Sequence, residues 1–216
     1  MLISVHVPKA AGSSFREVLH QHFGAQLLLD YADRPLAPGH RWRRIRADLR
    51  TAAGKSAALA PYACVHGHFV ADKYAFLGGR ARFVTWLRDP VQRVASHYHY
   101  WQRQPDLRNP DCRALIERKL SLADFAALPR MRNVMARFLG QVPLRDFYFV
   151  GLVEDLPASL TRFWRLTGID VDAHLHVNRN DDLETGSYEL TPALRAHLEQ
   201  LNRRDRELYE SARAMP

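Results

Sequence analysis

The first 22 residues constrain the fold most, because they combine a buried strand, a loop of small residues and an amphipathic helix. Residues 2–7, LISVHV, form an uncharged run rich in β-branched residues, which is typical of a buried strand. The loop PKAAGSS follows this run. The next residues recur at the spacing of one helical face, namely Phe15, Val18, Leu19 and His22. A strand, a short loop and a helix in this order form the repeating unit of a parallel α/β fold.

The rest of the chain continues this alternation of strands and helices. Strands are predicted at residues 27–31, 62–65, 82–87 and 147–150. Helices are predicted after Pro90, near 111–127 and 130–139, from 156 to 167, and as one last helix from Thr191 to Ala212. We therefore expect an α/β fold with a central parallel sheet flanked by helices, in a single domain that spans residues 1–216.

The loop PKAAGSS has the composition of an anion-binding turn. At such a junction, backbone N–H groups and the positive end of the helix point at one place, and that geometry binds phosphate. Alanine and glycine leave room for the anion, serine adds hydroxyl donors and lysine adds a mobile charge. The predicted anion-binding residues are Lys9, Ala10, Ala11, Gly12, Ser13 and Ser14. Because Lys9 precedes Gly12, the GxxxxGK[ST] pattern of kinases and ATPases is excluded, while a tight turn with a solvated lysine stays open.

A second strand–helix junction lies in RFVTWLRDPVQRVASHYHY, residues 82–100. Arg88 ends the strand, at the edge of the sheet where α/β folds place their ligands. Asp89 suits the N-cap of the next helix, and Pro90 suits its first turn. Ser96 follows about two turns into that helix. Arg88 and Ser96 could therefore bind a second phosphate together.

Two histidines, His66 and His68, lie in the segment HGHF between these junctions. An HxH pair can bind a metal, but the sequence offers no third ligand nearby, so no metal is expected. Packing or capping roles are a second interpretation. As a third, a neutral histidine can take a proton from a hydroxyl group, because its ordinary pKa lies near neutrality.

Both junctions resemble the motifs of one enzyme family, the sulfotransferases that use 3′-phosphoadenosine 5′-phosphosulfate (PAPS). The loop with lysine before glycine resembles their 5′-phosphosulfate-binding motif, in the form found in carbohydrate-specific members. The second junction resembles their 3′-phosphate-binding motif at Arg88, Asp89, Pro90, Arg93, Ser96 and Tyr98. The HGHF segment is similar to that of the heparan sulfate 2-O-sulfotransferase and uronyl 2-O-sulfotransferase family, in which a histidine of the HxH pair is the base.

This resemblance implies a P-loop-like nucleotide fold and transfer of a sulfuryl group from PAPS to an acceptor hydroxyl, expected on a carbohydrate. His68 is then the first choice for the base and His66 the second. Lys9 would stabilise the charge that develops on the departing phosphate. Two other interpretations stay open. One is the same chemistry on a lipid or small metabolite, and the other is a non-catalytic module that binds nucleotides or sulfated glycans.

The charge balance favours anionic partners. Lys and Arg number 31 against 23 Asp and Glu, which gives a formal net charge of +8. These basic residues are dispersed and match no nucleic-acid-binding motif, so nucleic acid is not expected as a partner. The sequence shows no signal peptide and no apolar run of the roughly 20 residues that span a bilayer. If residue 1 is the native start, a cytoplasmic protein is expected; if the chain has been trimmed, a lost membrane anchor stays open. Cys64 and Cys112 lack metal-ligand spacing, and whether they form a disulfide stays open.

Three further groups of polar residues have two interpretations each, a structural or surface role and a role at the site. A structural role is favoured for Arg93, Glu154 and Asp155. Both roles stay open for Arg132, Asn133 and Arg137. A surface loop is favoured for Asn178, Arg179 and Asn180, which could also close on a bound nucleotide.

Overall fold

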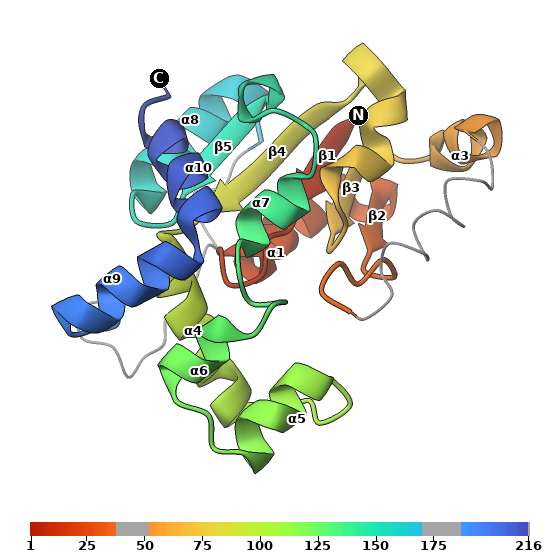
Figure 1. Ribbon diagram of the computed structural model, residues 1–216. Helices are drawn as coiled ribbons and strands as arrows, with labels where there is room; N and C mark the ends of the chain where they lie inside the picture. Colours follow the sequence, from red (N-terminus) through yellow and green to blue (C-terminus); the bar gives the residue numbers. More distant parts are fainter. Residues whose placement is uncertain (38–51, 170–186, 216) are drawn as a thin grey trace.

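The computed structural model describes residues 1–37, 52–169 and 187–215. Within them, five parallel strands form a sheet in the order β2-β3-β1-β4-β5 (Figure 1). The strands are Leu2–Val5 (β1), Leu27–Asp30 (β2), Cys64–Gly67 (β3), Arg82–Leu87 (β4) and Phe149–Leu152 (β5). The α/β class and the central parallel sheet are confirmed.

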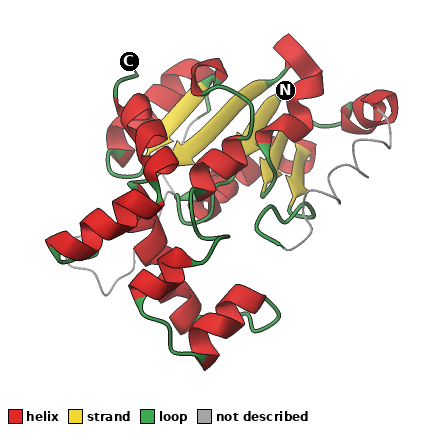
Figure 2. Cartoon of the chain, in the orientation of Figure 1, coloured by secondary structure: helices red, strands yellow, loops and turns green. Residues whose placement is uncertain are grey.

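Helices flank this sheet on both sides (Figure 2). The α-helices are Gly12–Phe23 (α1), Ala52–Leu59 (α3), Pro90–Arg103 (α4), Pro110–Glu117 (α5), Leu122–Ala127 (α6), Val134–Leu139 (α7), Leu156–Thr167 (α8), Pro192–Leu201 (α9) and Arg203–Arg213 (α10). Short 3-10 helices lie at Gly24–Gln26, Ala71–Arg80 and Leu144–Asp146. The 3-10 segment Ala71–Arg80, between β3 and β4, was not predicted from the sequence.

The central position of β1 explains why several predicted site residues lie together at the carboxyl ends of the strands. Its four residues are buried, and it pairs with β3 on one side and β4 on the other, with Ser4 opposite both His66 and Val84. Because the strands are parallel, their carboxyl ends meet at one edge. The loop after β1, the end of β3 and Arg88 after β4 therefore lie next to one another, although they are far apart in the sequence.

Aromatic packing fixes the first helix against the sheet. Phe15 of α1 is 1% exposed and lies edge-on to Trp86 of β4 and Phe163 of α8, at 5.5 and 5.1 Å between ring centroids. Burying one such side chain stabilises the fold by about 1.5–3 kcal/mol. Helices α1 and α8 thus cover one face of the sheet, and α7 and α10 cover the other (Figure 1). The helix that follows the predicted anion-binding loop is therefore held rigidly.

A second apolar cluster joins the helices that follow β4. It contains Val91 and Trp101 of α4, Leu115 of α5, Phe125 of α6 and Leu198 of α9. This cluster anchors α4, the helix that carries Ser96. Cys112 lies in this cluster and Cys64 in the sheet core, and both are buried free thiols.

Several predicted helix boundaries are confirmed. The Asp89 side chain accepts a hydrogen bond from the Gln92 N–H at 2.9 Å, which caps α4, and Pro90 is its first residue. Gly168 ends α8 in the left-handed region, with φ 72°.

The prediction of one helix from Thr191 to Ala212 is wrong. The chain breaks at Asn202, between α9 and α10. The fully buried Asn202 donates from its side-chain amide to the Leu198 carbonyl at 3.0 Å and accepts from the Asn133 N–H at 3.0 Å. The break is fixed by this contact with Asn133, which is distant in the sequence, so an apolar stripe that continues across Asn202 does not reveal the turn.

Three strand boundaries also differ from the prediction. The first strand ends at Val5 and not at residue 7, and β5 begins two residues later than predicted. The strand predicted at 62–65 lies at Cys64–Gly67. This last shift matters for the candidate site, because it places His66 within β3 and His68 directly after the carboxyl end of that strand.

Candidate active site

The loop between β1 and α1 carries an uncommon backbone conformation. Lys9 and Ala11 have φ values of 67° and 57°, in the left-handed region that side chains with a Cβ disfavour. Ala11 is the N-cap of α1, and the amides of the first turn, which begins at Gly12, have no acceptor within the helix itself. Strain of this kind accumulates where a loop must hold a ligand. The predicted phosphate-binding loop is thus a tight, strained turn into a helix.

The side chain of Lys9 reaches from this loop to α4. Its Nζ lies over the Tyr100 ring, 4.0 Å from the centroid. Burial, together with the charges of Arg88 and Arg103, lowers the pKa of Lys9 to about 8. A bound anion would stabilise the charged form of Lys9, because its negative charge offsets both the loss of solvation and the repulsion from the two arginines.

Arg88 links the two predicted phosphate-binding segments. Its Nη1 donates to the Lys9 carbonyl at 3.5 Å, and its Nε is buried without a hydrogen-bond partner among the described residues. Burial also lowers the pKa of this guanidinium, which nonetheless stays charged at neutral pH. Ser96 is 7% exposed and lies about 9 Å along α4 from Pro90. The orphaned donor, a second cation at Lys9 and the helix amides fit a ligand with more than one anionic group.

The buried member of the HxH pair is His66. It is 0% exposed in β3, and its Nδ1 is hydrogen-bonded to the Ser4 hydroxyl on β1 at 2.8 Å. Burial, and then the neighbouring His68, lowers the pKa of His66 to about 3. Its environment is that of a packed histidine within the sheet, which leaves His68 as the better placed of the two.

His68 follows the end of β3 and is partly exposed. Its ring lies 4.2 Å from that of His6, 4.9 Å from Tyr31 and 5.9 Å from Phe138 of α7, between centroids. Burial lowers the pKa of His68 to about 4, so the imidazole is neutral at physiological pH and can accept a proton.

Comparison with known proteins places this geometry in context. No protein-family model and no curated protein sequence matches the chain. Among solved structures, a sulfotransferase from Alicyclobacillus acidocaldarius matches with a TM-score of 0.53 and 17% identity, over 100% of this chain and 96% of that one. A mouse sulfotransferase complexed with PAP matches with a TM-score of 0.52 and 12% identity, over 100% of this chain and 88% of that one. The chain has the sulfotransferase fold.

Within this sulfotransferase fold, four side chains near the site were not singled out from the sequence. They are His6, Tyr31, His97 and Tyr100. His6 and Tyr31 contact His68. Burial lowers the pKa of His97 on α4, and the charges of Arg93 and Lys9 lower it further. The sequence signal for His6 is that it lies two residues after Ser4, just as His68 lies two residues after His66. Ser4 on β1 pairs with His66 on β3, so His6 comes to lie beside His68. That signal becomes visible only once the pairing of β1 with β3 is known.

Other polar residues hold the sulfotransferase fold together. Arg93 is 0% exposed and donates from Nη2 to the Met131 carbonyl at 3.2 Å. Glu154 accepts from the Asp89 N–H at 2.9 Å and from the Tyr209 hydroxyl at 2.8 Å. Both contacts agree with the structural interpretation of Arg93 and Glu154.

The stretch from Arg132 to Arg137 is also engaged within the protein. Asn133 accepts from the Arg204 N–H at 3.0 Å, Arg137 donates to the Pro129 carbonyl at 3.1 Å, and Arg132 donates to the Ala127 carbonyl. These contacts favour a structural role over an acceptor-facing one. Asn178, Arg179 and Asn180 lie outside the described residues.

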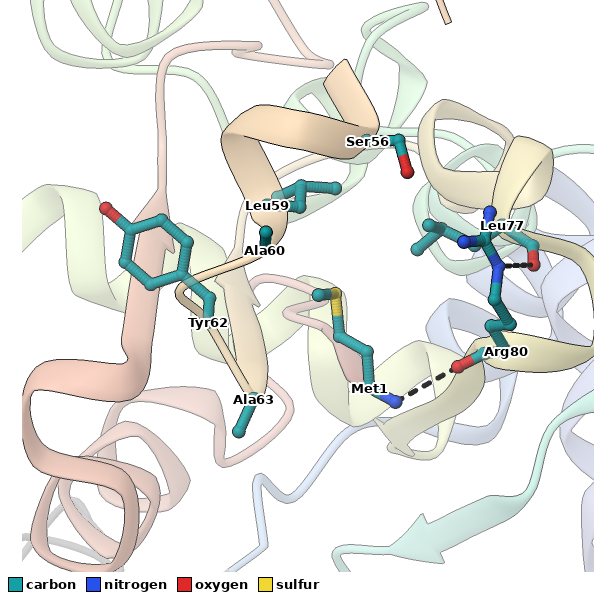
Figure 3. Close-up of a pocket in the computed structure, with 8 residues that line it drawn as sticks. All are labelled: Met1, Ser56, Leu59, Ala60, Tyr62, Ala63, Leu77 and Arg80. Atoms are coloured by element: carbon teal, nitrogen blue, oxygen red, sulfur yellow. Dashed lines mark hydrogen bonds between the residues drawn. The ribbon is translucent and has the colours of Figure 1, made fainter. Parts of the chain in front are cut away.

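A pocket of about 460 Å³ lies away from these groups (Figure 3). It is bordered by Met1 before β1, Ala63 before β3, Leu59 of α3 and Arg80, and so lies at the amino edge of the sheet. None of the candidate site residues lines it.

Within the described residues, which are those at 1–37, 52–169 and 187–215, no group of three or more His, Cys, Asp or Glu side chains is arranged to hold a metal ion. None of the described helices combines the length and the apolar character needed to cross a membrane.

Proposed function

We propose that the chain transfers the sulfuryl group of PAPS to an acceptor hydroxyl on a carbohydrate. The main support is that Lys9, Arg88 and His68 come from three adjacent strand ends. Lys9 and Arg88 are joined directly through the Lys9 carbonyl, at 3.5 Å. The ring of His6 contacts both His68, 4.2 Å away between centroids, and Gly12 in the loop that carries Lys9.

The motif resemblance assigns the two anionic ends of the donor to two groups of residues. The amides and hydroxyls at the start of α1, with Lys9, would hold the 5′-phosphosulfate. Arg88 and Ser96 would hold the 3′-phosphate, with the unpartnered Nε of Arg88 among the available donors. PAP, 3′-phosphoadenosine 5′-phosphate, is the nucleotide product of such a transfer.

The chemistry needs a base on the acceptor side and a cation on the leaving-group side. His68 would take the proton of the acceptor hydroxyl while the new oxygen–sulfur bond forms and the bond from sulfur to the 5′-phosphate oxygen breaks. Lys9 would stabilise the charge left on that phosphate. The products are a sulfate ester and PAP. Since the two phosphates are anionic, nucleotide binding should raise the low pKa of His68 and make it a stronger base.

The carbohydrate acceptor rests on the resemblance of the HGHF segment to the 2-O-sulfotransferases. Transfer to a lipid or a small metabolite would use the same donor site and the same base. Binding of nucleotide without transfer would mark a non-catalytic module.

Transfer of radiolabelled sulfate from PAPS to a panel of glycans, lipids and phenols tests the proposal. We expect label in a glycan, and we expect His68→Ala to lower kcat by about 100-fold or more with unchanged PAP affinity. His20→Ala, on the exposed face of α1, is the matched control. Full turnover by His68→Ala would rule out its role as base, and PAP binding without any labelled acceptor would favour the non-catalytic module.

A further inference from the structure

His6 contacts several side chains of the candidate site, yet the proposed chemistry gives it no role. It follows β1, where its backbone N–H donates to the Gly67 carbonyl at 2.9 Å. Its ring is stacked on His66 at 5.0 Å and tilted against His68 at 4.2 Å, between centroids. Its Nδ1 is hydrogen-bonded to the Tyr31 hydroxyl at 3.1 Å. The ring is therefore fixed by the two histidines at the carboxyl end of the adjacent strand β3, and by Tyr31 at the end of β2, the strand beyond β3.

The fourth neighbour of this ring is the anion-binding loop. A Cβ added to Gly12 would overlap the imidazole of His6, so the first residue of α1 must be glycine for the ring to lie where it does. The first turn of α1 and the ring of His6 are thus in direct contact. A shift of either one displaces the other.

We propose that His6 is a positioning residue. Its ring, fixed by the hydrogen bond to Tyr31, sets the base His68 against the first turn of α1. This inference rests on the proposed function, because it assigns His68 as the base and α1 as the donor-binding helix. In physical terms, the ring of His6 is an aromatic wedge: it lies between His68 and the first turn of α1 and fixes their separation. A misplacement of a reacting group by about 1 Å can cost roughly 100-fold in rate, so such a wedge has a measurable effect.

The groups that face His68 also keep it neutral and poorly solvated. His6 and His66 lie beside it from β1 and β3, and burial lowers the pKa of both. Tyr31 faces it from the end of β2, and burial raises the pKa of that phenol, partly offset by Arg16 of α1. His97 of α4 has a pKa that burial lowers well below its ordinary value. Removal of the His6 ring would let water reach His68.

The kinetic test separates positioning from donor binding. Tyr31→Phe removes the hydroxyl but keeps the ring, and His6→Phe keeps a ring without the hydrogen bond. We expect each to lower kcat by about 10- to 100-fold, with PAP affinity within about twofold of the wild type. His20→Phe, on the exposed face of α1, is the control. Unchanged kcat in both variants, or a loss of kcat that follows a loss of PAP affinity or of melting temperature, would overturn the proposal.

A second readout needs no enzymatic activity. Ring-proton NMR titration of the nucleotide-free protein measures the pKa of His68, which burial should lower to about 4 in the wild type. In His6→Ala we expect this pKa to rise by about one unit or more, because the burial that lowers it is relieved. An unchanged pKa of His68 in folded His6→Ala would contradict the proposed role of His6. If the pKa rises but no acceptor is ever sulfated, the contact between His6 and His68 stands and the proposed function fails.

Discussion

At the scale of single residues, Lys9 is the clearest case of chemistry set by its surroundings. The strained loop directs its side chain over Tyr100 and not into solvent. Burial and two neighbouring arginines lower its pKa to about 8. Without a bound anion, its charge is therefore partly lost just above neutral pH, whereas a bound phosphate would restore it.

The affinity for PAP should therefore depend on pH through Lys9. As pH rises through about 8, Lys9 in the free protein loses its proton and the attraction for the anion weakens. Calorimetric titrations between about pH 6.5 and about pH 9.5 should show falling affinity in the wild type. Lys9→Met should bind more weakly at the lower pH and lack this dependence, while Lys9→Arg should keep its charge throughout. Equal slopes in the wild type and Lys9→Met would contradict the assignment of Lys9 to the anion site.

At the scale of elements, α4 depends on a buried contact with the C-terminal helices. Asp205 of α10 is 0% exposed and accepts from the amides of Met135 and Ala136 in α7, at 3.0 and 2.8 Å. Its charge also faces the fully buried Arg93 of α4 and counteracts the lowering of the Arg93 pKa by burial. One carboxylate thus connects three helices on the side of the sheet where we propose that the donor binds.

Asp205→Ala should destabilise the fold strongly. It leaves two helix amides without their acceptor and a buried cation without its counter-charge, a loss of about 3–5 kcal/mol. Urea unfolding measures the change in the free energy of unfolding. Asp106→Ala is the control, because its partner Arg108 and the carboxylate itself are exposed, and no loss is expected there. Equal stability of the two variants would show that the buried contact contributes nothing.

The elements most visible in the sequence were those with local signals. Asp89 and Pro90 indicate the start of α4, and Gly168 indicates the end of α8, because helix caps depend on neighbouring residues alone. The break at Asn202 was missed because it depends on a contact with Asn133, far away in the sequence. For the same reason the sequence suggested His68 but not its neighbours His6 and Tyr31, which come from other strands.

At the scale of the whole molecule, the fold gathers neutral histidines at one edge of the sheet. Burial lowers the pKa of His6, His66, His68 and His97. In the unfolded chain each would have an ordinary pKa near 6.5. Their contribution to stability is therefore present above about pH 6.5 and is lost as the pH falls below it, because only the unfolded chain then takes up protons.

The free energy of unfolding should accordingly decrease from about pH 7.5 to about pH 5. Urea unfolding at a series of pH values measures this slope. His66→Gln should flatten it, because one of the buried histidines is gone, whereas His20→Gln, on an exposed helix face, should leave it unchanged. A wild-type stability that does not change over this range would contradict the burial of neutral histidines.

The central claim is that one edge of the sheet binds a nucleotide with phosphates at both the 3′ and 5′ positions. Calorimetry with PAP and with AMP, which lacks the 3′-phosphate, tests it most directly. The wild type should prefer PAP by about tenfold or more, since a charged hydrogen-bond donor contributes about 1.5–3 kcal/mol. Arg88→Ala should abolish this preference and change AMP binding little, while Arg80→Ala, at the opposite edge of the sheet, should keep it. Equal binding of PAP and AMP by the wild type, or an intact preference in Arg88→Ala, would contradict the account.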